Sequence, residues 1–232
     1  MAEQSRPVSP SRRKMVLSGS ALATTAWVAP SVTRLDRVAA AVGTCGIAPL
    51  QVDWSAFTGT FPSSVTAADG TQVTITTADP ANVGNANFLG LVFNGTLNGL
   101  QNPLLMAMDG ATNGDFTAVT FQFSRPVALC FSMLDVDFGD FPTGWEDTIE
   151  FAGTLGGANV DLTAADIVTS SGNIVTGTNT VLGTANVAQT STNGQIDITY
   201  PSPIDQVTIR HIDVSTRTGF QYVGIHDLHW CP

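Results

Sequence analysis

The chain carries almost no positive charge beyond residue 40. Its single lysine is Lys14, and only Arg125, Arg210 and Arg217 follow residue 40. Seventeen acidic residues accompany these three arginines, so this part of the chain has a net charge of −14. Nucleic acids and anionic lipid surfaces both bind proteins through clustered lysine and arginine. The composition therefore predicts no nucleic-acid partner, and it suits cations or neutral sugars.

The sequence also lacks the short motifs of common catalytic and nucleotide sites. It contains no P-loop, no G-x-G-x-x-G, no H-E-x-x-H and no G-x-S-x-G nucleophile elbow. The three histidines are His211, His226 and His229. Side chains three apart on a strand point to opposite faces, so His226 and His229 are not expected to bind one metal ion together. His211 continues an apolar strand face, and we expect it in the core or at its rim.

Helical spacing of apolar residues is absent beyond the first 41 residues. Short alternating segments recur instead, separated by glycine, asparagine, aspartate and proline, which is typical of an all-β sandwich or barrel. The clearest alternation places Val119, Phe121 and Phe123 on one face. One buried and one solvated face is the pattern of an antiparallel sheet, so the sequence predicts an all-β antiparallel β-sandwich.

Turn residues divide the chain into expected strands. Asp69-Gly70 and Asn98-Gly99 predict hairpins, because these dipeptides tolerate positive φ. Ser124-Arg125-Pro126 is expected to separate two strands, since proline cannot donate to a ladder. Residues 169–192 have few large apolar side chains and predict loops or an edge. The expected strands are residues 50–54, 71–77, 88–93, 104–108, 116–123, 127–138, 147–153, 159–163, 181–188, 195–200, 206–213 and 220–230.

The basic first 41 residues resemble a twin-arginine signal peptide. Arg12 and Arg13 precede a moderately apolar stretch, residues 16–32, and Ala39-Ala40-Ala41 offers a small-residue cleavage site. A basic tail and a membrane anchor are the alternatives, but the stretch is short and rich in serine, threonine and alanine. We therefore expect a signal peptide over residues 1–41, one domain over residues 42–232, and a secreted bacterial protein without a stable membrane span.

Three cysteines are present, and the sequence assigns them different roles. First and last strands of an antiparallel sandwich often pair, so Cys45 and Cys231 are expected to form a disulfide in an oxidising exterior. Cys130 lies in an apolar run and is expected to be a buried thiol. Lipid attachment at Cys45 is disfavoured because Thr44 precedes it. The spacing of the three cysteines supports no metal site.

The acidic stretch of residues 129–151 is the main candidate for chemistry. Asp135 and Asp137 are two apart, which on a strand places them on one face roughly 6.5–7 Å apart. With Asp140 and Asp147 they form a candidate structural Ca²⁺ site, because a hard divalent cation relieves the repulsion between neighbouring carboxylates. The alternative is a solvated acidic loop that keeps a sheet edge soluble.

The same stretch offers candidates for ligand contact. Trp145 and Phe141 flank the acidic residues in a glycine- and proline-containing turn, and we expect them to contact a ligand. Trp54 and Trp230 are expected in the core, and Tyr222 is a further aromatic able to stack on a sugar ring. Asp135 and Asp137 also fall within the separation that glycosidases use, although catalytic carboxyl pairs usually come from different elements.

The body of the chain resembles a type of secreted bacterial β-sandwich domain. The resemblance is carried by FQFSRPVALCFSMLDVDF, WEDTIEF, ITYPSPIDQVTI and the closing VGIHDLHW. It implies a jelly roll similar to carbohydrate-binding modules over about residues 50–231. The expected function is a non-catalytic binding or surface module for an extracellular glycan or surface polymer, with a structural calcium ion. The alternatives are a carboxylate-dependent, glycosidase-like hydrolase and a structural matrix protein without a small ligand.

Overall fold

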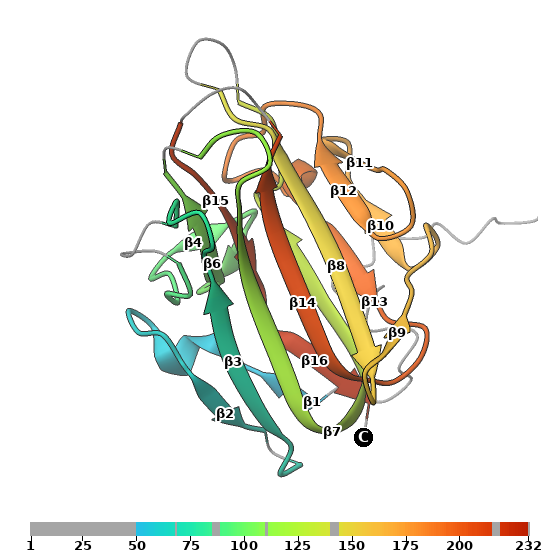
Figure 1. Ribbon diagram of the computed structural model, residues 1–232. Helices are drawn as coiled ribbons and strands as arrows, with labels where there is room; N and C mark the ends of the chain where they lie inside the picture. Colours follow the sequence, from blue (N-terminus) through green and yellow to red (C-terminus); the bar gives the residue numbers. More distant parts are fainter. Residues whose placement is uncertain are drawn as a thin grey trace, which may run out of the picture. The chain divides into compact units, whose positions relative to one another are not determined.

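The computed structural model describes residues 50–67, 69–84, 89–109, 111–139, 144–214 and 219–231 (Figure 1). The predicted signal peptide, Cys45, Asp140 and Phe141 lie outside the described residues. The export route and the Cys45–Cys231 disulfide therefore stay predictions. Among the described residues, no helix is long and apolar enough to cross a membrane.

The described residues form antiparallel strands and two short 3₁₀ turns, with no α-helix among them. The all-β expectation is thus confirmed, while the jelly-roll connection stays a prediction. Residues 169–192 contribute β11, at one sheet edge, and β12 beside it. The elements are β1 (Leu50–Val52), η1 (Trp54–Phe57), β2 (Ser64–Thr66), β3 (Gln72–Ala78), β4 (Thr96–Leu97), β5 (Leu100–Gln101), β6 (Leu104–Met108), β7 (Phe116–Leu134), β8 (Asp147–Leu155), β9 (Ala158–Val160), β10 (Ile167–Thr169), β11 (Asn173–Val175), β12 (Thr180–Gly183), η2 (Thr192–Gly194), β13 (Ile196–Thr199), β14 (Ile204–Asp213), β15 (Gln221–Ile225) and β16 (Leu228–Cys231).

Two layers of strands share the long strand β7 (Figure 1). The first layer, here the β14 sheet, has the order β2–β3–β7–β14–β8–β12–β11, with β9 paired to the end of β8. In the second layer, here the β16 sheet, β7 lies between β13 and the successive strands β15 and β16. Strands β10, β6 and β1 complete this layer by pairing with β13, β15 and β16.

Strand β7 belongs to both sheets because it bends near its middle. Residues 116–123 pair with β3 and β14, and residues 128–134 pair with β13, β15 and β16. The expectation that Ser124-Arg125-Pro126 separates two strands is wrong, because the strand continues through these exposed residues into the other sheet. Pairing with β3 stops at residue 123, and pairing with β14 is irregular between Gln122 and Val127. Proline's missing N–H is therefore tolerated at this corner.

The core lies between the two sheets, where inward-facing aromatic rings meet. Trp54 and Trp230 are both fully buried, as expected, although Trp54 begins η1 and does not belong to the first strand. Three ring pairs join the layers, with centroids 5.7–6.0 Å apart: Trp54–Phe121, Phe123–Trp230 and Phe131–Phe151. Side chains of this size each contribute roughly 1.5–3 kcal/mol when fully buried, so this layer of rings holds the sheets together.

Replacing Phe121 by alanine is expected to lower the free energy of unfolding by about 3–5 kcal/mol, because its ring is fully buried against Trp54. Val168→Ala is the control, since Val168 is 52% exposed and such surface changes stay within about 0.5 kcal/mol. Urea unfolding of the full chain, followed by tryptophan fluorescence, measures both. Equal losses in the two variants would contradict the placement of the core.

Candidate functional site

A cluster of acidic side chains is buried where β7 leaves the β16 sheet. The strand ends at Leu134, and the next residue, Asp135, has a φ of 63°. Its main-chain N–H donates to Asn98 Oδ1 at 2.5 Å. This left-handed turn corrects the expectation that Asp135 and Asp137 lie on one face of a strand, because the strand ends before either residue. A left-handed aspartate persists only where its surroundings hold it, and such residues often mark functional sites.

Asp135 and Asp137 line the same pocket, which has a volume of about 230 Å³. Its wall combines three segments that are distant in the sequence. Trp145 comes from the acidic stretch, Gln189 from the segment before η2, and Tyr222 from β15. Carboxylates, side-chain amides and aromatic rings therefore converge on one small space.

Asp137 is held by two hydrogen bonds at the wall of this pocket. Its Oδ1 accepts a bond from the Trp145 indole N–H at 2.7 Å, and its Oδ2 accepts one from the Val187 main-chain N–H at 2.9 Å. Burial raises the pKa of Asp137 to about 6, while these two hydrogen bonds oppose the rise and the charge of Asp147 adds to it. The bonds fix the carboxylate and the indole ring relative to each other.

The carboxylate of Asp135 has fewer hydrogen-bond partners than that of Asp137. Asp135 is only 7% exposed, and its Oδ1 has no hydrogen-bond partner among the described residues. Burial, followed by the charges of Asp137 and Asp147, raises the pKa of Asp135 to about 7. Burial, together with the charges of Asp135 and Asp137, raises the pKa of the neighbouring Tyr222 to about 12. A residue of the pocket wall thus carries a buried carboxylate oxygen that has no hydrogen-bond partner among the described residues.

Asp147 lies deeper, in a fully buried pair with His211. His211 Nε2 is 2.7 Å from Asp147 Oδ1, and both side chains are 0% exposed. Asp147 Oδ2 accepts a hydrogen bond from the main-chain N–H of Asp137 at 3.1 Å. Burial raises the pKa of Asp147, and His211 opposes that rise. The expectation of a core histidine at His211 is confirmed, and the pair anchors the main chain beneath the pocket.

Two glycines let the acidic segment fold this closely. A Cβ atom at Gly183 would lie 2.0 Å from the carbonyl oxygen of Asp137, so β12 can approach that residue only with glycine. A Cβ atom at Gly139 would lie 2.6 Å from the Trp145 ring, which rests against the main chain there. The tryptophan ring is thereby fixed in place beside the carboxylates.

The structure brings together three of the site residues expected from the sequence. Asp135, Asp137 and Trp145 line the pocket, whereas Asp147 is buried behind it. Gln189 and Gln221 complete the wall but had no signal in the sequence. The position of Gln221 follows from the pairing of β15 with β6 and β7, which joins segments more than 80 residues apart. Gln189 lies before η2 and is held at β15 by its hydrogen bond to the Tyr222 hydroxyl.

Among the described residues, the acidic side chains alone do not form a compact set of three potential metal ligands. Within the part of the chain that the structure describes, the one group of three potential metal ligands with ligand atoms within 4.8 Å of one another is His226, Asp227 and His229. The calcium site therefore stays a prediction, and its fourth expected residue, Asp140, lies outside the described residues.

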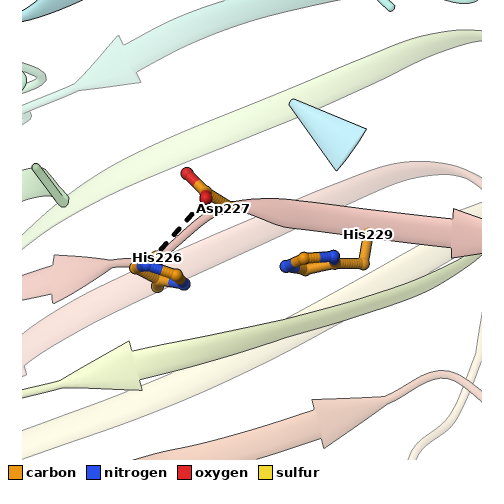
Figure 2. Close-up of side chains that lie close together, drawn as sticks. All are labelled: His226, Asp227 and His229. Carbon is orange, nitrogen blue, oxygen red and sulfur yellow. Dashed lines mark ion pairs between the residues drawn. The ribbon is translucent and has the colours of Figure 1, made fainter. Parts of the chain in front are cut away.

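The expectation that His226 and His229 point to opposite faces is wrong. Residues 226 and 227 lie between β15 and β16, and Ile225 pairs with Met133 while His229 pairs with Cys130. The chain segment from Ile225 to His229 thus has one residue more than the segment it faces, which is a β-bulge. Figure 2 shows the two imidazole rings on the same side of the strand.

Comparison with known proteins assigns no family to the chain. No protein-family model matches the sequence, and no curated protein matches it. One similar solved structure is a glycoside hydrolase family 43 arabinoxylan arabinofuranohydrolase from Bacillus subtilis in complex with cellotetraose. The sequences are 12% identical, the TM-score is 0.28, and the match covers 72% of this chain and 32% of that one. The chain spans about a third of that enzyme, and a likeness of this size carries no argument about function.

The raised pKa of Asp135 predicts a pH-dependent stability. The carboxyl titrates near 3.8 in an unfolded chain and near 7 in the fold, so the folded state binds more protons between these values. Its contribution to the free energy of unfolding is full below about pH 4 and is lost as the pH rises through about 7. Asp135→Asn removes the titration and suits the left-handed backbone. We therefore expect the variant to gain on the order of 1–4 kcal/mol over the wild type across this window.

Urea unfolding at several pH values measures this difference. Asp161→Asn, at an exposed carboxyl, is the matched control and should show no such trend. A difference between Asp135→Asn and wild type that stays flat from pH 4 to pH 8 would show that the carboxyl is not kept from water.

Proposed function

We propose that this chain is a secreted, non-catalytic binding module whose pocket at Asp135, Asp137 and Trp145 takes one sugar unit of a glycan. The carrying observation is the buried Oδ1 of Asp135, which has no partner among the described residues and belongs to a pocket wall with aromatic rings. Export by the twin-arginine route is part of the proposal and rests on the sequence of the first 41 residues.

The size of the pocket favours a small ligand. Its volume of about 230 Å³ lies below the roughly 300–1,000 Å³ of pockets that enclose drug-sized molecules. A single sugar ring presents hydroxyl groups at its edge and C–H groups on its faces. Carboxylate oxygens of Asp135 and Asp137 can accept from the hydroxyls, and the rings of Trp145 and Tyr222 can pack against the C–H faces.

Gln221 supports the same reading independently. It is 2% exposed, and neither its Oε1 nor its Nε2 has a hydrogen-bond partner among the described residues. Leaving a buried polar group unpaired costs about 1–3 kcal/mol. A ligand hydroxyl, which both donates and accepts, would satisfy such an amide. The neighbouring Gln189 is already engaged, since its amide donates to the Tyr222 hydroxyl.

A carboxylate-dependent hydrolase is the second candidate, and the pair of raised pKa values favours it. Glycoside hydrolysis needs one carboxyl that donates a proton and another that acts as base or nucleophile. Asp135, with a pKa near 7, is suited to the first role, and Asp137 lines the same pocket. Both oxygens of Asp137 already accept hydrogen bonds, which leaves the carboxylate poorly placed to attack a substrate.

Substitutions at Trp145 test the binding proposal. On a glycan array the full chain is expected to bind a defined set of glycans. Trp145→Ala is expected to weaken that binding by about 10-fold or more, because a stacked ring contributes on the order of 1 kcal/mol beyond its buried area. Trp145→Phe keeps a ring and loses the indole N–H, so its binding should stay within a few-fold of wild type.

Val168→Ala, at an exposed residue on β10, is the control for that experiment. No glycan bound above background, or equal binding by Trp145→Ala and wild type, would refute the sugar-binding pocket. Release of new reducing ends from a bound oligosaccharide, lost in Asp135→Asn, would identify the hydrolase instead.

Calcium binding at Asp135 and Asp137 is the second part of the proposal, and it is tested by thermal unfolding. Ca²⁺ accepts six to eight oxygen ligands, and the two carboxylates would supply the charged ones. Adding Ca²⁺ to EDTA-treated full chain is expected to raise the Tm by a few degrees, because the ion binds only the folded state. Asp135→Asn should abolish the rise. An unchanged Tm in the wild type would exclude a structural calcium ion.

A further inference from the structure

We propose that His226, Asp227 and His229 form a binding site for a divalent metal ion of the zinc class (Figure 2). One ligand atom from each residue lies within 4.8 Å of the others. A tetrahedral zinc ion with Zn–N bonds of 2.0–2.1 Å holds its ligands about 3.3 Å apart, so modest side-chain rotation completes the set. None of these three residues lines the pocket at Asp135.

The β-bulge at residues 226 and 227 is the structural basis of the cluster. Ile225 and Leu228 are both fully buried and point into the core, although they are three apart in the sequence. This is possible only because the extra residue resets the alternation between β15 and β16. The residues beside them, His226 and His229, consequently share the outer side of the β16 sheet. Bulges of this kind re-aim side chains, and functional sites often contain them.

His229 supplies an observation independent of the clustering. Both of its ring nitrogens are shielded from solvent, and neither has a hydrogen-bond partner among the described residues. An imidazole must accept at one nitrogen or carry two protons, and leaving it unpaired costs free energy of folding. A metal ion bound to one nitrogen removes that cost. Figure 2 shows the ring of His229 turned toward His226.

Both imidazoles lie in surroundings that shift their pKa values. Burial lowers the pKa of His226, against the opposing charges of Asp53 and Asp197, and burial likewise lowers the pKa of His229.

The carboxylate of Asp227 is already oriented by the main chain. Its Oδ1 accepts a hydrogen bond from the Trp54 N–H at 3.1 Å, and its Oδ2 lies 3.9 Å from His226 Nε2. One oxygen is thus fixed while the other faces the histidines. Hydrogen bonds of this type commonly orient metal ligands and strengthen binding.

The donor set selects the class of metal. Two imidazole nitrogens and one carboxylate oxygen suit Zn²⁺, whereas Ca²⁺ and Mg²⁺ prefer sites made of oxygen alone. All three residues are partly exposed.

Titration of the metal-free full chain with Zn²⁺ tests the proposal. Calorimetry is expected to show one Zn²⁺ bound per chain, and Co²⁺ in its place should give visible d–d absorption bands typical of nitrogen coordination. Loss of an outer partner of a metal ligand already costs about 10–100-fold in affinity. His229→Gln and Asp227→Asn are therefore each expected to raise the Kd for Zn²⁺ by about 100-fold.

Asp53→Asn is the matched control, because it removes a neighbouring carboxylate that is not a ligand. It should change the Kd by no more than a few-fold, and Ca²⁺ should not compete with Zn²⁺ at this site. Circular dichroism and a Tm measured without metal establish whether each variant is folded. If His229→Gln does not fold, the Co²⁺ spectrum of the wild-type chain alone decides whether the histidines bind the metal. Absence of stoichiometric Zn²⁺ binding, absence of nitrogen-type Co²⁺ bands, or equal Kd values for wild type and folded His229→Gln would overturn the proposal.

Discussion

Continuous main-chain pairing of β7 is the constraint on which the rest of the structure depends. The first half of this strand is the partner of β3 and β14, and the second half is the partner of β13, β15 and β16. Each sheet is therefore positioned by the same strand, and the aromatic rings between the sheets meet as a consequence. The end of β7 also fixes where Asp135 emerges, because the left-handed turn follows directly after its last paired residues.

Polar groups buried at that end oppose the stability that the core provides. Asp135, Asp137 and Asp147 are all raised in pKa by burial, and their mutual charges add to the rise in Asp135. A fold tolerates buried polar groups where they are hydrogen-bonded. The carboxylates of Asp137 and Asp147 both form hydrogen bonds. Asp135 Oδ1 and the Gln221 amide have no hydrogen-bond partner among the described residues. A ligand that forms hydrogen bonds with them would therefore recover the free energy that their unpaired burial costs.

The sequence allowed the strands to be predicted more reliably than the way they are joined. Alternation identified the buried face at Val119 and Phe121, because period-two patterns depend only on neighbouring residues. The bend at Pro126 could not be predicted, because it depends on where the partner strands of β7 end. The bulge before His229 could not be predicted either, because it depends on which residues of β7 lie opposite it. Gln221 reaches the pocket through long-range strand pairing as well. Local sequence patterns do not reveal such contacts. Asp135, Asp137 and Trp145 were found because they are near one another in the sequence, and Tyr222 was found as an aromatic residue, whereas Gln189 and Gln221 were missed.

Titration of the Asp135 carboxyl itself tests the central claim most directly, namely that the pocket keeps an unsatisfied acid out of water. Carboxyl carbon chemical shifts from ¹³C NMR follow this group in the full chain, and Asp135→Asn identifies its signal. The account predicts a midpoint near pH 7 in the absence of ligand. A midpoint near 4, the ordinary value for an aspartate in water, would contradict it.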